Sequence, residues 1–321
     1  MKHMNKKLVL LILPILALTA CPKEGTLAKS MDFYAYNKKE SVHLYSLKFE
    51  YDENGNRVKE TKNYDSDSTK HDIISYTYNE NNQILEVNYS YVQNDSPVPG
   101  AGFIEKYEYN DKGLLVSYKV DYESTSVGNY SYYEYDDLNR VIKQTDQIYD
   151  KELAKVTSTY ELDHQYIGDT NYLSISRYYS YISSTTKKLT NRETYTYNED
   201  YTQEVMKSEA FKISGASDGE FYMFTEYNSN HQVLKYGAKL EGANMIDVNQ
   251  DYRLYEYDGS GRLVKEQSQI VVQPYISAVC AKHEYTYKGE ELKEDMCYKA
   301  NAFLDDSNVT WMPDTRSVYK F

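Results

Sequence analysis

The chain has 321 residues and a formal net charge of −13 at pH 7. This acidic balance argues against a nucleic-acid partner and against a surface that lies flat on anionic lipid, because both attract basic patches. Tyrosine is the unusual residue, with 38 copies against 8 Phe and a single Trp. A tyrosine ring packs against cross-strand neighbours while its hydroxyl stays hydrated, so the composition favours β-sheet over a thick apolar core.

Residues 1–20 have the pattern of an export signal. A lysine-rich start precedes an apolar run over residues 8–18, which is too short to span a membrane. The run ends in Leu-Thr-Ala-Cys and resembles the bacterial lipobox, which implies cleavage before Cys21 and lipidation of its thiol. The alternative is an ordinary secretory signal with a chance cysteine. We expect a lipid anchor in the outer membrane, facing the periplasm or the surface, with residues 21–32 as a linker.

One motif recurs along the rest of the chain: an aromatic residue, any residue, Tyr, and then Asp or Asn. Clear copies end at Asp52, Asn79, Asn110, Asp136, Asn198 and Asp258, and one more ends at Lys288 in place of Asp or Asn. Weaker copies end at Asp163 and Asn228. These markers follow one another at intervals of 26 to 35 residues. A period of this length is typical of repeat architectures.

Each copy has the chemistry of a β-hairpin. The residues before the marker alternate with period 2, and an Asp or Asn side chain accepts backbone hydrogen bonds at the start of a turn. Three residues later, a type I turn with a bulge needs a residue at positive φ. Gly and Asn adopt that conformation most easily, and they fill five of these eight positions. The positions are Gly55, Asn82, Gly113, Asn139, Tyr201, His231, Gly261 and Glu291.

The repeats predict one all-β domain over residues 33–321. Nine hairpins joined by looser connections make a long antiparallel meander of about 18 strands. A sheet of this length twists and curls, so we expect a twisted or curled open sheet. Charged residues on both faces of most strands disfavour a transmembrane barrel.

The motif resembles the YD repeats of the rearrangement-hotspot (Rhs) and teneurin-type families, most clearly over residues 49–59, 133–143 and 255–265. In those families, YD repeats build a sheet that spirals into a hollow shell, and some members bind carbohydrate or act as cell-surface contact proteins. This chain is far shorter than such a shell and lacks the Asp-Pro-Gly-rich segment that precedes a released toxin. The resemblance therefore implies a fragment of a YD-repeat shell and carries over neither toxin encapsulation nor self-cleavage.

The motif tyrosines are the candidate binding residues. Rows of rings along one sheet face offer apolar planes with polar tips, which suit a sugar or a peptide. Packing within the sheet is the competing explanation for every one of them. The predicted binding face consists of Tyr107, Tyr109, Tyr133, Tyr135, Tyr195 and Tyr197.

Two further cysteines, Cys280 and Cys297, fall on the two arms of the last predicted hairpin. A disulfide between them depends on the turn: a three-residue turn puts them on opposite faces, and one residue more or less puts them on the same face. Two lone cysteines do not make a structural zinc site, and the histidines are scattered. We therefore predict no metal, no cofactor and no catalytic residues.

The sequence favours a non-enzymatic lipoprotein of the cell envelope that acts as a binding or adhesion module, with polysaccharide as one candidate ligand. The alternative is a structural or assembly component whose end strands dock an envelope protein by strand addition. An enzyme is disfavoured because no set of residues points to a reaction.

Overall fold

The computed structural model describes residues 27–37, 40–212, 214–239, 252–272, 277–302 and 311–321, and their regular elements are all β-strands. The predicted signal segment 1–20 and the lipidation candidate Cys21 lie outside the described residues, and the predicted linker is described only from residue 27. Among the described residues, no helix could span a bilayer.

The strands follow one another in a meander. The first ones are β1 (Ser30–Asn37), β2 (Glu40–Tyr51), β3 (Arg57–Tyr64), β4 (Lys70–Tyr78), β5 (Ile84–Gln93), β6 (Ser96–Pro97), β7 (Phe103–Tyr109), β8 (Leu115–Tyr122), β9 (Val127–Tyr135), β10 (Val141–Asp150) and β11 (Lys155–Tyr166). The remaining ones are β12 (Leu173–Tyr181), β13 (Lys187–Tyr197), β14 (Gln203–Phe211), β15 (Ser217–Tyr227), β16 (Val233–Lys239), β17 (Tyr252–Tyr257), β18 (Leu263–Val272), β19 (Ser277–Lys288), β20 (Glu291–Ala302) and β21 (Met312–Lys320).

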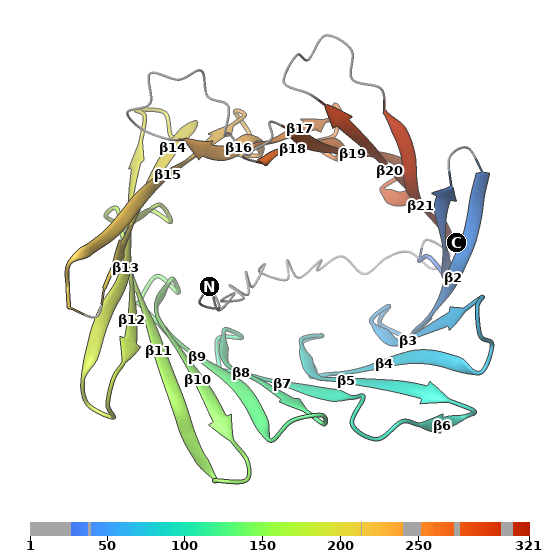
Figure 1. Cartoon of the computed structure of the whole chain (residues 1–321), viewed down its shortest axis with the longest axis horizontal. Coiled ribbons are helices and arrows are strands. Elements are labelled where there is room, and N and C mark those ends of the chain that lie inside the picture. The colour runs from blue at the N-terminus through green and yellow to red at the C-terminus, as the bar shows by residue number, and fades with distance from the viewer. Residues whose placement is uncertain (1–26, 38–39, 213, 240–251, 273–276, 303–310) are drawn as a thin grey trace.

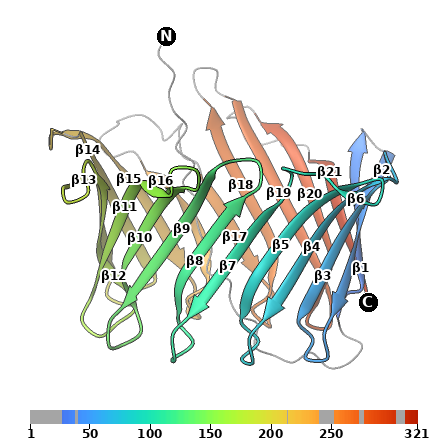
Figure 2. The same cartoon turned by 90° about the horizontal axis from the view of Figure 1, so that it is seen from below.

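The sheet closes into a barrel, and the prediction of an open sheet is wrong. Strand β1 pairs with β2 on one side and with the last strand, β21, on the other, through pairs such as Phe33 with Ser317. The two-residue strand β6 only extends the β5 hairpin, while β5 pairs onward with β7. The closed ring therefore has 20 antiparallel strands. Figure 1 shows this ring from one end, and Figure 2 shows its tilted strands from the side.

Recurring β-bulges give a physical reason for the closure. A bulge increases the local twist of a strand and bends it. The pairing register shifts beside the second tyrosine of the motif in most hairpins, so the same bend is repeated around the sheet. These shifts occur at Glu50/Tyr51, Thr77/Tyr78, Glu108/Tyr109, Glu226/Tyr227, Glu256/Tyr257 and Thr286/Tyr287.

The predicted turn chemistry is confirmed at seven of the eight positions. Positive φ values occur at Gly55, Asn82, Gly113, Asn139, Tyr201, His231 and Gly261. The last hairpin is the exception, because Glu291 is the first residue of β20 and pairs with Lys288. There, Gly289 takes the positive φ of 62° and leaves a tighter, two-residue turn.

The weak motif copy at Asp163 is also corrected. Asp163 lies inside β11 and pairs with Lys143, and the turn comes at residues 167–172. Ile167 therefore stands where other repeats have Asp or Asn, and Tyr166 stands as the second tyrosine. With this reassignment the long interval of 35 residues disappears, because Asp136, Ile167 and Asn198 are evenly spaced along the sequence.

Candidate functional site

The six tyrosines predicted to form a binding face share one face of the sheet, which we call the tyrosine face. Residues paired across a ladder point to the same side, and so do residues two apart along a strand. One series of ladder pairs runs through Tyr107, Tyr118, Ser131 and Asp146. A second series runs through Gln144, Leu162, Tyr178 and Asn191. All six tyrosines are only partly exposed.

The second tyrosine of most repeats ties that repeat to an earlier part of the chain. Its hydroxyl donates a hydrogen bond to a backbone carbonyl, which in every case but Ala28 belongs to the first residue of the previous return strand. Seven such bonds of 2.6 to 3.0 Å run from Tyr51 to Ala28, Tyr78 to Arg57, Tyr109 to Ile84, Tyr135 to Leu115, Tyr166 to Val141, Tyr257 to Val233 and Tyr287 to Leu263. Two of the six predicted residues, Tyr109 and Tyr135, therefore have a packing role.

The first tyrosine of a repeat often binds a carboxylate on the tyrosine face. Glu105 accepts hydrogen bonds from Tyr107 at 2.6 Å and from Tyr118 at 3.0 Å. Glu193 accepts bonds from Tyr178 at 2.9 Å and from Tyr195 at 2.7 Å. Burial and the adjacent carboxylate raise the pKa of the Tyr107 and Tyr195 hydroxyls well above the usual value.

Tyr133 is held in a similar environment. Burial, with the nearby Asp146 carboxylate, raises its pKa to about 12. Asp146 itself accepts a hydrogen bond of 2.6 Å from Ser131 on the neighbouring strand. Three first tyrosines, Tyr107, Tyr133 and Tyr195, thus keep their protons at neutral pH and face carboxylates within the sheet.

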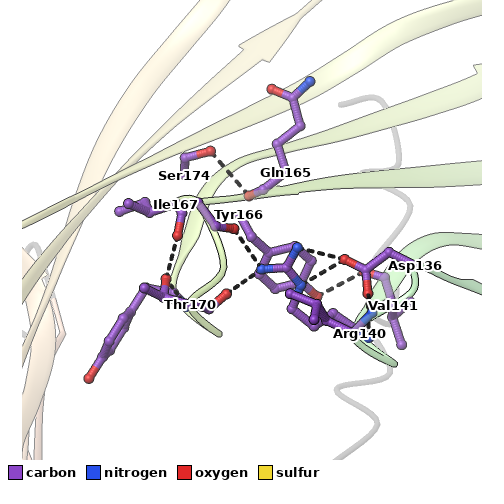
Figure 3. A network of polar contacts seen from close by, with 11 residues as sticks. Asp136, Arg140, Val141, Gln165, Tyr166, Ile167, Thr170 and Ser174 are labelled. Atoms are coloured by element: carbon purple, nitrogen blue, oxygen red, sulfur yellow. Dashed lines mark hydrogen bonds and ion pairs between the residues drawn. The ribbon is translucent and has the colours of Figure 1, made fainter.

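A polar network holds the irregular turn at residues 167–172 in place (Figure 3). The Asp136 carboxylate pairs with the Arg140 guanidinium at 2.7 Å, and Arg140 Nη1 then donates to the carbonyls of Gly168 at 2.8 Å and Thr170 at 2.5 Å. Burial of Asp136 opposes its ionisation, but the hydrogen bonds from Arg140 outweigh it and lower the Asp136 pKa. The guanidinium also lies 4.5 Å from the ring centre of Tyr166.

The anchored turn presents Tyr172 to an aromatic cluster. Tyr201, from the next hairpin turn, stacks on Tyr172 with ring centres 4.3 Å apart and planes inclined by 16°. Tyr197 lies 5.1 Å from Tyr172, and His231, from the following turn, lies 6.4 Å away. Three consecutive repeat turns therefore contribute one ring each, and Tyr197 adds a fourth.

An open recess of about 320 Å³ lies beside this cluster. We call it the aromatic recess, and its lining residues are Ile167, Tyr195, Thr196, Tyr197, Asn198, Glu199 and Tyr201. Two of the six predicted binding residues, Tyr195 and Tyr197, belong to it.

Glu199 lines the recess, and two more acidic residues belong to the same hairpin. Burial raises the pKa of Glu204, although hydrogen bonds from Tyr197 and Tyr227 oppose the shift. In the exposed turn, hydrogen bonds from Thr202 lower the pKa of Asp200, so Asp200 carries a negative charge at neutral pH. Such a site disfavours anionic ligands.

The candidate disulfide is not supported by the ladder. Cys280 stands opposite Ala300 and Cys297 stands opposite His283, so the two backbone positions are three pairs apart along the hairpin. Cys297 carries a free, buried thiol, while the side chain of Cys280 lies outside the described residues. Within the described ranges, no three His, Cys, Asp or Glu side chains gather as a metal ion would require.

Sequence reasoning missed Tyr172 and gave Tyr201 and His231 only a turn role. A signal for the latter two was present, since a bulky ring stands where five other repeats have Gly or Asn. Tyr172 gave no such signal, because the turn that carries it lacks the Asp or Asn marker.

No protein-family model matches the chain, and no curated protein matches its sequence. Solved structures do show similarity. The Photorhabdus luminescens Tc holotoxin pore has 12% identity and a TM-score of 0.39, over 87% of this chain and 16% of that chain. The TcdB2–TccC3–Cdc42 complex has 13% identity and a TM-score of 0.43, over 88% of this chain and 15% of that chain.

A porin-like protein from Bacteroides uniformis ATCC 8492 has 9% identity and a TM-score of 0.38, over 91% of this chain and 97% of that chain. The present chain thus spans only a small part of the Tc toxin chains and nearly all of the porin-like one.

Proposed function

We propose that the protein is a non-enzymatic binding protein of the cell envelope that takes a neutral or amino sugar in the aromatic recess. The observation that carries this proposal is Tyr201, whose backbone is held at a φ of 56° while its ring stacks on Tyr172. A residue other than Gly in this conformation costs about 1–2 kcal/mol. Backbone strain of this kind clusters at ligand sites.

The chemistry of the recess supports a sugar as ligand. Aromatic faces offer flat apolar surface to the C–H side of a sugar ring, and polar groups at the edge fix its orientation. Here Tyr197 and Tyr201 supply the faces, and Asn198 and Glu199 supply polar groups. The nearby carboxylates favour neutral or amino sugars over acidic ones.

The alternative function is docking of a protein partner by addition of a strand at the ends of the sheet. The closed barrel does not favour this alternative. Strand addition needs an unpaired edge. Strands β1 and β21 pair with each other, and closure into a barrel removes such edges.

Location in the envelope rests on the amino-terminal pattern and remains a prediction. Two lipid chains on Cys21 would bind the protein to a membrane, because each buried methylene contributes about 0.8 kcal/mol. Replacement of Cys21 by Ser is expected to move the protein from the membrane fraction to the soluble fraction of disrupted cells. Retention of the C21S variant in the membrane fraction would argue against lipid attachment.

The function is tested by titrating the full chain with a panel of soluble neutral, amino and acidic oligosaccharides in a calorimeter. We expect binding of a neutral or amino sugar, without release of cleaved product, and its loss in Tyr172→Ala. The matched control is Tyr149→Ala, which removes another stacked ring, 5.4 Å from Tyr130. Equal loss of binding in both variants, or binding of acidic sugars alone, would refute the proposal.

A further inference from the structure

A thiol, an imidazole and a carboxylate meet on the tyrosine face near the end of the chain. His283 on β19 stands directly opposite Cys297 on β20 in the antiparallel ladder. Asp295 lies two residues before Cys297, so its side chain leaves the same face of the sheet. His283 is separate in sequence from the other two residues, and the register of this hairpin brings the three together.

The three groups are linked through the imidazole ring. His283 Nδ1 lies 2.9 Å from Asp295 Oδ1, and the Cys297 side chain stands across the ladder from the same imidazole. The thiol itself donates a weak hydrogen bond of 3.9 Å to the Tyr298 carbonyl. The Cys297 residue is 8% exposed and its thiol is free. A nucleophile beside a base that is oriented by a third group is the arrangement that activates cysteines.

The surroundings favour a charged imidazole. The hydrogen bond that the imidazole donates to Asp295, together with the neighbouring Cys297 side chain, raises the pKa of His283 to about 10, against the opposing effect of burial. On the other neighbouring strand, β18, Glu266 stands opposite His283. On β21, the neutral residues Thr315 and Ser317 stand opposite Cys297 and Asp295. An imidazolium that is paired with Asp295 and stands opposite the thiol is positioned to stabilise a thiolate.

We propose that Cys297, with His283 and Asp295 as positioning residues, is a reactive thiol that forms mixed disulfides with small disulfide compounds. The Cys297 thiolate, formed beside the charged imidazole, attacks one sulfur of the compound. The new bond joins Cys297 to that sulfur as the original sulfur–sulfur bond breaks. The released thiolate takes the proton from His283, so the exchange consumes no further oxidant or reductant.

The expected rate advantage follows from thiolate content. An ordinary thiol, with a pKa of about 8.5, is about 1% ionised at pH 6.5. Full ionisation would raise the thiolate fraction about 100-fold. The lower nucleophilicity of a more acidic thiol offsets roughly tenfold of this gain, which leaves about a tenfold advantage.

The test uses the full chain and 2-hydroxyethyl disulfide, a small neutral probe. Mass spectrometry follows the rate of mixed-disulfide formation on the peptide that contains Cys297, which separates it from the other cysteines. We expect a nearly pH-independent rate between about pH 6 and 8. In His283→Asn the rate at pH 6.5 should fall about tenfold and should then rise about tenfold per pH unit, as for an ordinary thiol.

The matched control is His164→Asn, on the same face, where the imidazole bonds Ser176 at 2.9 Å. This control should leave the rate unchanged. The proposal is overturned if wild-type Cys297 fails to react, or if its rate already rises tenfold per pH unit. The wild-type pH profile decides the question even if His283→Asn does not fold.

Discussion

At the scale of single residues, a tyrosine's role depends on its position within the repeat. In most repeats the second tyrosine donates its hydroxyl to a carbonyl of the neighbouring repeat, as Tyr135 does to Leu115 at 2.6 Å. The first tyrosine packs and often binds a carboxylate. Where the turn departs from the repeat pattern, rings such as Tyr201 gather around a recess.

Replacement of Tyr135 by Phe removes one inter-repeat bond and keeps the ring. Loss of one such hydrogen bond is expected to lower the free energy of unfolding by about 0.5–1.5 kcal/mol. Urea denaturation measures the difference. The control is Tyr132→Phe, which keeps the ring that faces the Lys119 ammonium at 6.0 Å. Equal destabilisation by both changes would show that the Tyr135 hydroxyl adds nothing of its own.

The sequence predicted which tyrosines share a face, because alternation along a strand needs no tertiary information. It did not separate packing tyrosines from recess tyrosines, since Tyr135 and Tyr197 stand at the same motif position. The sequence likewise did not predict the group formed by Cys297, His283 and Asp295. This group depends on a turn of two residues, and the marker pattern predicted that turn at the wrong position.

At the scale of the hairpin, the marker side chain builds each turn. Asn110 Oδ1 accepts the backbone N–H groups of Lys112 at 3.0 Å and Leu114 at 2.9 Å. The residue after such a turn often reaches the next one, as Gln83 does when its side-chain amide donates to the Gly113 carbonyl at 2.7 Å. Neighbouring turns are therefore coupled around one rim of the barrel.

Asn110→Ala removes both turn bonds and is expected to lower the free energy of unfolding by roughly 1–3 kcal/mol. Asn110→Asp should restore most of the loss, because Asp52 occupies the same position and accepts the same pair of bonds. Thermal unfolding of the three proteins measures the effect. If Asp fails to rescue the Ala variant, the side-chain acceptor is not what stabilises the turn.

Turn positions were the most predictable part of the fold, because Gly and Asn at positive φ mark them in the sequence. The failures at Asp163 and Glu291 have a common cause. In both places the chain builds its turn with different residues: Thr170 at residues 167–172, where its hydroxyl bonds the Ile167 carbonyl at 2.7 Å, and Gly289 in the last hairpin.

At the scale of the whole molecule, the ends of the sheet meet. Closure depends on twist summed over 20 strands, and no short stretch of sequence encodes that sum. In the sequence, the sign of these recurring bulges was the presence of Gly or Asn, residues that tolerate a positive φ, in the turns. Their joint effect on curvature appears in the ring of Figure 1.

A cross-link between the ends tests the closure. Ser30 on β1 and Lys320 on β21 are direct ladder partners, and paired Cα atoms about 4.5–5.5 Å apart suit a disulfide. The double variant Ser30→Cys, Lys320→Cys should form the bond on air oxidation, as peptide mapping would detect. The control Ser30→Cys with Lys106→Cys on β7 should not. Cross-linking in neither variant, or equally in both, would contradict the closed barrel.

Tyr201→Gly tests whether one repeat turn has been adapted to bind a ligand. Glycine relieves the strain of the positive φ, worth about 1–2 kcal/mol, while loss of the stacked ring costs about 0.5–1.5 kcal/mol. We therefore expect nearly unchanged stability together with lost oligosaccharide binding. Asn139→Gly, at the same position of another repeat, should change neither. Retained binding in Tyr201→Gly would show that the Tyr201 ring does not bind the ligand.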